Sequence, residues 1–249
     1  MREAPGSDGI TSRGRVADHG EVFTPPGLVR DMLDLPGVRE ECLRVEARFL
    51  EPACGDGNFL AEVLRRRLVA VCERHPKSAR VAWERDALRG MANLYGIELL
   101  HDNVQACRDR LTALFEGLYR DRFRKQADGR VVAAATHLAA ANVHLGDALK
   151  MSTVGDGVYG ARPLVFTQWS MPGGGRFKRR LFEYRELLDP GGEDDQGSLF
   201  NGRPPAKRPL LGDDGKPVFL ARPVGDLPVV HYLKLGDEPH PTLPRPATA

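Results

Sequence analysis

The chain has 249 residues, a length that suits one α/β domain or one domain with a long appendage. Hydrophobic residues make up 41% and charged residues 28%, as in ordinary globular proteins, which argues against a disordered chain. The formal net charge of +2 is too small to identify a nucleic-acid-binding protein, so the local distribution of charge must decide that question.

The cysteines neither form a C-x-x-C pair nor lie near histidines at zinc-ligand spacing. They are Cys42, Cys54, Cys72 and Cys107. We therefore expect thiols buried in a reducing compartment and no metal site. The N-terminus lacks the apolar core of a signal peptide and no run is long enough to span a membrane, so we expect a cytoplasmic protein.

Residues 1–20 are rich in Gly, Ser, Arg and Asp and predict a flexible arm. Thr24 as N-cap and Pro25 at the first position predict a helix that buries Leu28, Val29, Met32 and Leu33 and ends at residues 35–37. A short strand over 47–51, a turn over 52–57 and a long amphipathic helix are expected next.

Helical spacing over 79–92 precedes a second strand at 93–99, and another helix begins at about Asp102. A third strand is expected at 142–145 and a fourth at 163–169. Strands that alternate with helices predict an α/β fold, with a mostly parallel sheet covered on both faces.

Residues 186–249 read as a loop-rich extension, rich in Asp, Gly and Pro over 186–228. Short strands at 216–221 and 229–235 could form a hairpin. We therefore divide the chain into an arm (1–20), a main domain (21–185) and this extension (186–249).

Gly55 and Gly57 lie in the turn between the first strand and its helix. Glycines allow tight turns and let a ligand approach the main chain, and the helix that follows presents unpaired N–H groups. One such turn is weak evidence for a nucleotide site. Glu98 and Asp147 end the next two strands, where ligands bind in open parallel sheets. Either acid alone could be a helix cap or a solvated turn, but three such turns side by side predict a ligand site.

Four segments together resemble the motifs of adenine-specific DNA methyltransferases from restriction-modification systems. They are Gly20–Val29, Phe49–Leu60, Leu94–Leu99 and Asn142–Leu149. The resemblance covers residues 20 to about 150 and implies a Rossmann-like fold that binds S-adenosylmethionine.

The resemblance also implies a role for each matching residue. Phe23, Thr24 and Pro25 would close over the methionine end of the cofactor. Its amino-acid moiety would be lined by Glu51, Ala53, Gly55 and Gly57. Glu98 would accept the ribose hydroxyls, Leu99 would pack on the adenine ring, and Asp147 would accept from the adenine amino group.

Catalysis in this family uses Asn/Asp/Ser-Pro-Pro-aromatic after the fourth strand, and the chain has no such tetrapeptide. The nearest candidate there is Ser170–Gly173, in which Ser170 and Pro172 would be catalytic. Trp169 is either a substitute stacking surface or, as we favour, a core residue. Asn201–Pro205 has the right residue types at the wrong spacing.

The resemblance implies DNA as the substrate, with specificity supplied by a target-recognition or restriction subunit or lost by truncation. Arg176, Lys178, Arg179 and Arg180, interleaved with aromatics, could contact DNA phosphates; a solvated amphipathic helix is the alternative. Gln196–Phe200 is similar to the peptide that docks bacterial DNA enzymes on the sliding clamp.

Three functions remain open. The chain is an S-adenosylmethionine-dependent DNA methyltransferase or its methylation subunit, or it is a non-catalytic relative that binds the cofactor and DNA. A methyltransferase for RNA or protein is the third, which residues 23–26 disfavour.

Overall fold

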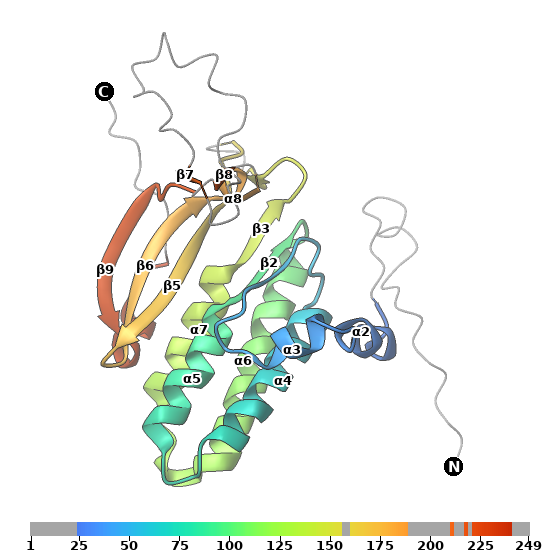
Figure 1. The fold of residues 1–249 in the computed structure, drawn as a ribbon. Coiled ribbons are helices and arrows are strands. Elements are labelled where there is room, and N and C mark those ends of the chain that lie inside the picture. Colours follow the sequence, from blue (N-terminus) through green and yellow to red (C-terminus); the bar gives the residue numbers. More distant parts are fainter. Residues whose placement is uncertain (1–23, 156–159, 189–209, 212–216, 219–220, 241–249) are drawn as a thin grey trace.

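The computed structural model describes residues 24–155, 160–188, 210–211, 217–218 and 221–240 (Figure 1). Four strands form the first sheet, in the order β1 (Phe49–Glu51), β2 (Leu94–Glu98), β3 (Val143–Asp147) and β4 (Ser152–Thr153). β1, β2 and β3 are parallel, whereas β4 runs antiparallel to β3. The predicted α/β fold with a parallel-rich sheet is therefore confirmed for these strands.

The expected helices are present, with ends shifted by a few residues. They are α2 (Pro26–Leu33), α4 (Asn58–Arg74), α5 (Arg80–Ala92) and α6 (His101–Phe123). The helices α3 (Val38–Leu43) and α7 (Gly129–Asn142) were not predicted, nor was the short helix α8 (Tyr184–Leu188). The α7 helix is rich in alanine and buried along much of its length, so it lacks a clear amphipathic pattern.

The helix α2 departs from its prediction in two details. Pro25 is the N-cap and Pro26 the first helical residue, one position later than expected, and no side chain caps the helix. Val29 and Leu33 are buried as predicted, but Leu28 and Met32 are 51% and 44% exposed. The apolar face of α2 is therefore wider than the part of the helix that packs against the rest of the protein.

Helices α4 to α7 extend beyond the first sheet at the end opposite to the carboxyl ends of β2 and β3 (Figure 1). An aromatic cluster joins α5 to α6, in which Trp83 of α5 stacks on Tyr119 of α6 with ring centroids 5.4 Å apart. Phe115 and Phe123 complete the cluster. Because α5 leads straight into β2, this cluster holds the helix that precedes that strand.

The expected fourth parallel strand is wrong, because that segment belongs to a second, antiparallel sheet of three strands. β5 (Val165–Gly173), β6 (Arg176–Glu183) and β9 (Gly225–His231) are antiparallel. β5 starts beside the end of β3, where the Leu164 N–H donates to the Met151 carbonyl at 3.0 Å. It ends near the start of β3, where the indole N–H of Trp169 donates to Asn142 at 2.8 Å. β5 therefore runs opposite to β3 (Figure 1).

The C-terminal part of the chain also differs from the prediction. β9 pairs with β6 rather than forming a hairpin with the preceding segment, and the short strand β8 (Pro217–Val218) pairs with β7 (Leu210–Leu211). The 3-10 helix η3 (Tyr232–Asp237) follows β9, and its Leu235 is fully buried. Residues 225–237 thus belong to the packed body, although they fall in the expected loop-rich extension.

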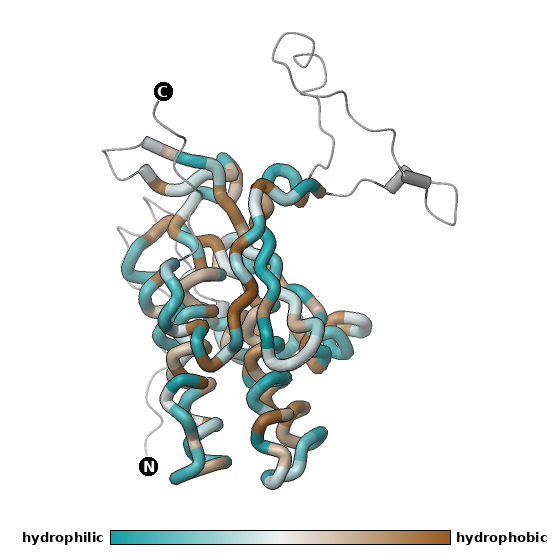
Figure 2. Tube along the Cα trace, turned by 90° about the vertical axis from the view of Figure 1, so that its left-hand side faces the viewer, coloured by the Kyte–Doolittle hydropathy of each residue, from teal (hydrophilic) through white to brown (hydrophobic). Residues whose placement is uncertain are grey.

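Three short elements complete the described structure: the 3-10 helix η1 (Arg124–Gln126), the helix α8 (Tyr184–Leu188) and an isolated bridge between Ser152 and Pro163. Seen from the side of the second sheet, hydrophobic stretches run along the strands, while the helices below alternate between hydrophilic and hydrophobic segments (Figure 2). Within the described residues, no helix combines the length and apolarity needed to cross a membrane.

Candidate cofactor site

The turn after β1 is shaped by its glycines and held against β2. The Cys54 N–H donates to the Ile97 carbonyl at 3.0 Å, and the Gly57 N–H donates to the Cys54 carbonyl at 2.9 Å. Gly57 is the N-cap of α4 at φ +91°, and a Cβ there would lie 2.7 Å from the Cys107 sulfur. Backbone conformation and space thus both require glycine at this position.

Glu98 joins two turns at the carboxyl end of the parallel strands. Its Oε2 accepts from the Gly55 N–H and its Oε1 from the Leu100 N–H, both at 2.9 Å. These bonds fix the orientation of the carboxylate, and each oxygen retains a lone pair that can accept another hydrogen bond.

The acids that end β1 and β3 have different surroundings. Burial raises the pKa of Glu51, whose Oε1 accepts a hydrogen bond from the Ala53 N–H at 3.3 Å. Backbone hydrogen bonding from Lys150 lowers the pKa of Asp147, which also accepts from the Leu149 N–H. The Oδ1 atom of Asp147 therefore accepts backbone hydrogen bonds as a helix cap does, which is the alternative role considered from the sequence. Its Oδ2 atom lies 3.2 Å from the Lys150 ammonium.

These turns border one cleft of about 460 Å³, large enough for a small-molecule ligand. Of the predicted cofactor residues, six from the three turns line it together with Thr24. The six are Glu51, Ala53, Gly55, Glu98, Leu99 and Asp147. Pro25 and Gly57 adjoin these residues in the chain without lining the cleft, and Phe23 lies outside the described residues.

The cleft also contains residues that the sequence analysis did not single out. They include Cys54, Asp56, Asn58, Phe59, Leu100 and Asn103. Asn103 follows Glu98 by little more than one helical turn, so its position in the first turn of the next helix could have identified it. Phe59 was interpreted only as a core residue and is half-buried.

Cys54 meets a second thiol beneath the turn. Hydrogen bonding to Cys107, followed by burial, raises the pKa of Cys54, so the thiol stays protonated at neutral pH. Cys42, Cys54 and Cys107 are buried, as expected, whereas Cys72 is half-buried. Gly96 is also required here, since a Cβ would lie 2.8 Å from the Cys54 sulfur.

The structure does not bring Ser170 and Pro172 to this cleft. Both lie toward the end of β5, which is at the opposite end of β3 from Asp147. Ser170 is exposed and pairs with Lys178 across the second sheet, and Pro172 lies where the β5–β6 register shifts. The expected position beside the target side of the cofactor is corrected, because β5 runs antiparallel to β3.

Trp169 is a core residue, as favoured from the sequence. Its side chain is 3% exposed and packs edge-on against Phe177 with ring centroids 5.5 Å apart. The alternative role as a stacking surface for a base requires an exposed ring.

The basic segment is the strand β6, not a helix, so its side chains alternate between two faces. Arg176 and Lys178 are exposed. Arg179 is 2% exposed, where it donates to the Pro228 carbonyl and pairs with Glu238 at 2.8 Å. Arg180 lies 3.5 Å from Asp226. Arg179 is therefore unavailable for phosphate contacts.

Two further motifs from the sequence, Asn201–Pro205 and the clamp-like Gln196–Phe200, lie outside the described residues. Among the described residues, no group of three or more His, Cys, Asp or Glu side chains could hold a metal ion.

The chain is similar to the type II methyltransferase M.PaeR7I of Pseudomonas aeruginosa, with 32% identity over 114 residues. The aligned stretch covers 45% of this chain and 19% of the relative, so the match spans about a fifth of the relative's length. No protein-family model and no solved structure matches the chain.

Proposed function

We propose that this chain is the S-adenosylmethionine-binding part of a DNA methyltransferase that modifies the adenine amino group. The observation that carries the proposal is the convergence of three acid-bearing turns and Thr24 on one cleft at the carboxyl ends of parallel strands. The similarity to a type II methyltransferase supports methyl transfer. The motifs of residues 20–149 support DNA and adenine.

The residues of the cleft fit this cofactor. The carboxylate of Glu51 would pair with the ammonium of the methionine moiety, and the start of α4 offers N–H groups for its carboxylate. Glu98 would accept the ribose hydroxyls, and Asp147 would accept from the adenine amino group. Leu99 and Phe59 provide apolar surface for the ring. When bound, the cofactor supplies an electrophilic methyl group on its sulfonium.

We further propose that the target-binding tetrapeptide comes from another polypeptide. Ser170 and Pro172 lie at the far end of β5, and among the described residues no strand pairs with the outer edge of β1. Leu50 of β1 is 40% exposed, although strands of parallel sheets are normally covered on both faces. A partner that adds a strand to this edge would bring its residues next to the cleft.

The experiment is calorimetric titration with S-adenosylmethionine, followed by transfer of a labelled methyl group to duplex DNA. Transfer is measured with the chain alone and with each polypeptide encoded beside it, and the methylated nucleoside is identified. We expect cofactor binding by the chain alone and N6-methyladenine when the partner is present. If the chain does not bind S-adenosylmethionine at a concentration of about 1 mM, the proposal is contradicted. A ligand that binds the native protein should also raise its stability at this concentration, if Kd is well below it.

The second candidate is a non-catalytic protein that binds the cofactor and DNA. The position of Ser170 and Pro172 away from the cleft favours it. This candidate would be selected if the chain binds the cofactor but transfers no methyl group with any of the polypeptides encoded beside it. A methylated cytosine or RNA product would instead contradict the adenine-DNA assignment.

A further inference from the structure

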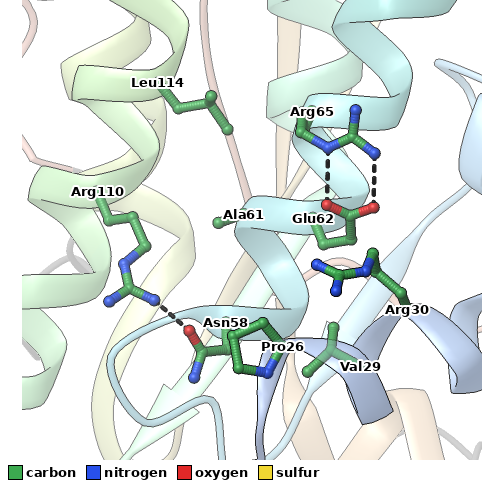
Figure 3. Close-up of a pocket in the computed structure, with 9 residues that line it drawn as sticks. All are labelled: Pro26, Val29, Arg30, Asn58, Ala61, Glu62, Arg65, Arg110 and Leu114. Atoms are coloured by element: carbon green, nitrogen blue, oxygen red, sulfur yellow. Dashed lines mark hydrogen bonds and ion pairs between the residues drawn. The ribbon is translucent and has the colours of Figure 1, made fainter. Parts of the chain in front are cut away.

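The glycine-rich turn is held from outside by an arginine of α6. Arg110 donates to both carboxylate oxygens of Asp56, at 2.6 and 3.3 Å. It also donates to the side-chain oxygen of Asn58, a contact that Figure 3 shows. Asp56 stands between the two glycines of the turn, and Asn58 is the first residue of α4. These contacts link positions more than 50 residues apart in the chain.

Asn58 extends the connection to the N-terminal segment. Its amide nitrogen lies 3.4 Å from the Thr24 carbonyl, and both residues line the cofactor cleft. On its other side Asn58 borders a smaller hollow of about 230 Å³, together with Arg110 and Pro26. Arg110 therefore holds the glycine-rich turn directly, and Asn58 links it to the N-terminal segment.

Charge explains why the turn needs this arginine. The start of α4 attracts an anion, and the methionine carboxylate of the proposed cofactor would approach it there. Asp56 lines the same cleft, so its negative charge alone would repel that carboxylate. Arg110 pairs with Asp56 while the side chains are 39% and 25% exposed, which leaves a nearly neutral pair beside the helix start.

We propose that Arg110 is a positioning residue for the amino-acid end of the cofactor. It holds the glycine-rich turn and neutralises Asp56, so that a ligand carboxylate is accepted at the start of α4. The inference rests on the proposed function, because it concerns how the same cleft takes S-adenosylmethionine.

The test compares two ligands, S-adenosylmethionine and its decarboxylated analogue, by calorimetric titration. Arg110→Met should weaken binding of S-adenosylmethionine about tenfold or more, equivalent to about 1.4 kcal/mol, and change binding of the analogue much less. Adding Asp56→Asn to Arg110→Met should restore most of the lost affinity, because the repelling charge is gone. A loss of fold alone would produce neither the ligand selectivity nor the rescue.

Arg120→Met is the matched control. Arg120 lies on the same helix and pairs with Glu116 one turn away at the surface, so its replacement should leave both affinities unchanged. If Arg110→Met does not fold, Arg110→Lys replaces it: the charge stays, the two-pronged contact is lost, and a smaller loss specific to S-adenosylmethionine is expected.

The outcomes separate the inference from the function it rests on. A wild-type chain that does not bind S-adenosylmethionine overturns the proposed function. A wild type that binds, with an Arg110→Met variant that binds equally well, overturns only the role of Arg110. An equal loss for both ligands that Asp56→Asn does not restore also overturns it.

Discussion

The hydroxyl of Tyr232 donates a hydrogen bond of 2.8 Å to the carboxylate of Glu84, joining η3 to α5 across 148 positions of sequence. Glu84 is 1% exposed and also accepts from Tyr119 at 2.5 Å and from Arg80 at 2.5 Å. The C-terminal part of the described chain is thus tied to the helices that lead into the first sheet.

We expect Tyr232→Phe to destabilise the protein, because it leaves a buried carboxylate oxygen with one donor fewer. The loss should be about 1–3 kcal/mol, seen as a melting temperature several degrees lower in calorimetry. Thr136→Val is the control, since its hydroxyl donates only to the exposed turn before it. Equal melting temperatures for the Tyr232→Phe protein and the wild type would contradict this reading of the Glu84 cluster.

The raised pKa of Glu51 predicts opposite effects on stability and binding. Burial disfavours the charged form, so the favourable contribution of the protonated group is lost as pH rises through the raised pKa. Glu51→Gln should therefore stabilise the free protein at neutral pH. The same variant should bind S-adenosylmethionine about tenfold or more weakly, because the ammonium loses its charged partner.

The pH dependence of cofactor affinity checks this assignment of Glu51. Wild-type affinity should fall on acidification before the ordinary carboxyl range is reached, as Glu51 takes up a proton. The Glu51→Gln variant should lack this fall. Glu73→Gln, a change at an exposed position of α4, should leave both the stability and the affinity unaltered. A wild-type affinity that is flat from neutral pH down to the ordinary carboxyl pKa would remove Glu51 from the site.

Each carboxylate oxygen of Glu98 accepts a hydrogen bond from a backbone N–H, so replacing either oxygen by a donor should break one of these bonds. Glu98→Gln keeps the size of the side chain, but its amide group must face either the Gly55 N–H or the Leu100 N–H. We expect the turn to shift and affinity for S-adenosylmethionine to fall by about 1–3 kcal/mol. Calorimetric titration measures the loss, with Glu116→Gln on the surface of α6 as the control. Unchanged affinity in a folded Glu98→Gln protein would refute the ribose assignment.

The burial of the basic side chains on β6 predicts which of them can contact DNA. If Arg176 and Lys178 contact phosphates, replacing both by Ala should lower the slope of log affinity against log salt by about two. Arg179→Ala should leave that slope unchanged and lower the stability, because it removes a buried guanidinium that bonds to the Pro228 carbonyl and pairs with the partly exposed Glu238. Fluorescence anisotropy with duplex DNA at several salt concentrations measures the slope. A slope that the double variant does not change would assign the outer face of β6 to solvent.

Much of the candidate cofactor cleft could be predicted because its signals are local. Gly57 needs a positive φ, and Glu98 and Asp147 are the last residues of the short strands β2 and β3, so sequence position alone placed them at strand ends. Once the strands are parallel, their carboxyl ends meet at one edge and the acids converge.

Contacts between distant positions could not be predicted in the same way. Arg110 gave no local signal, since its partners Asp56 and Asn58 lie 54 and 52 positions away. The alanine-rich α7 is covered on most sides, which removes the alternation of polar and apolar residues that marks a surface helix.

By itself, the sequence determined the order of the first three strands, the helices α2, α4, α5 and α6, and the chemical nature of the turns after the strands, because hydrophobic periodicity and glycine act over a few residues. The tertiary structure alone decided the direction of β5 and the burial of Arg179. A run of apolar residues indicates that a strand is buried, but it does not indicate the direction of the strand in the sheet, because that direction depends on pairing with distant segments. The pairing of β5 with β6 holds Ser170 away from the candidate cofactor cleft, and Glu238 at the end of η3 lies beside Arg179.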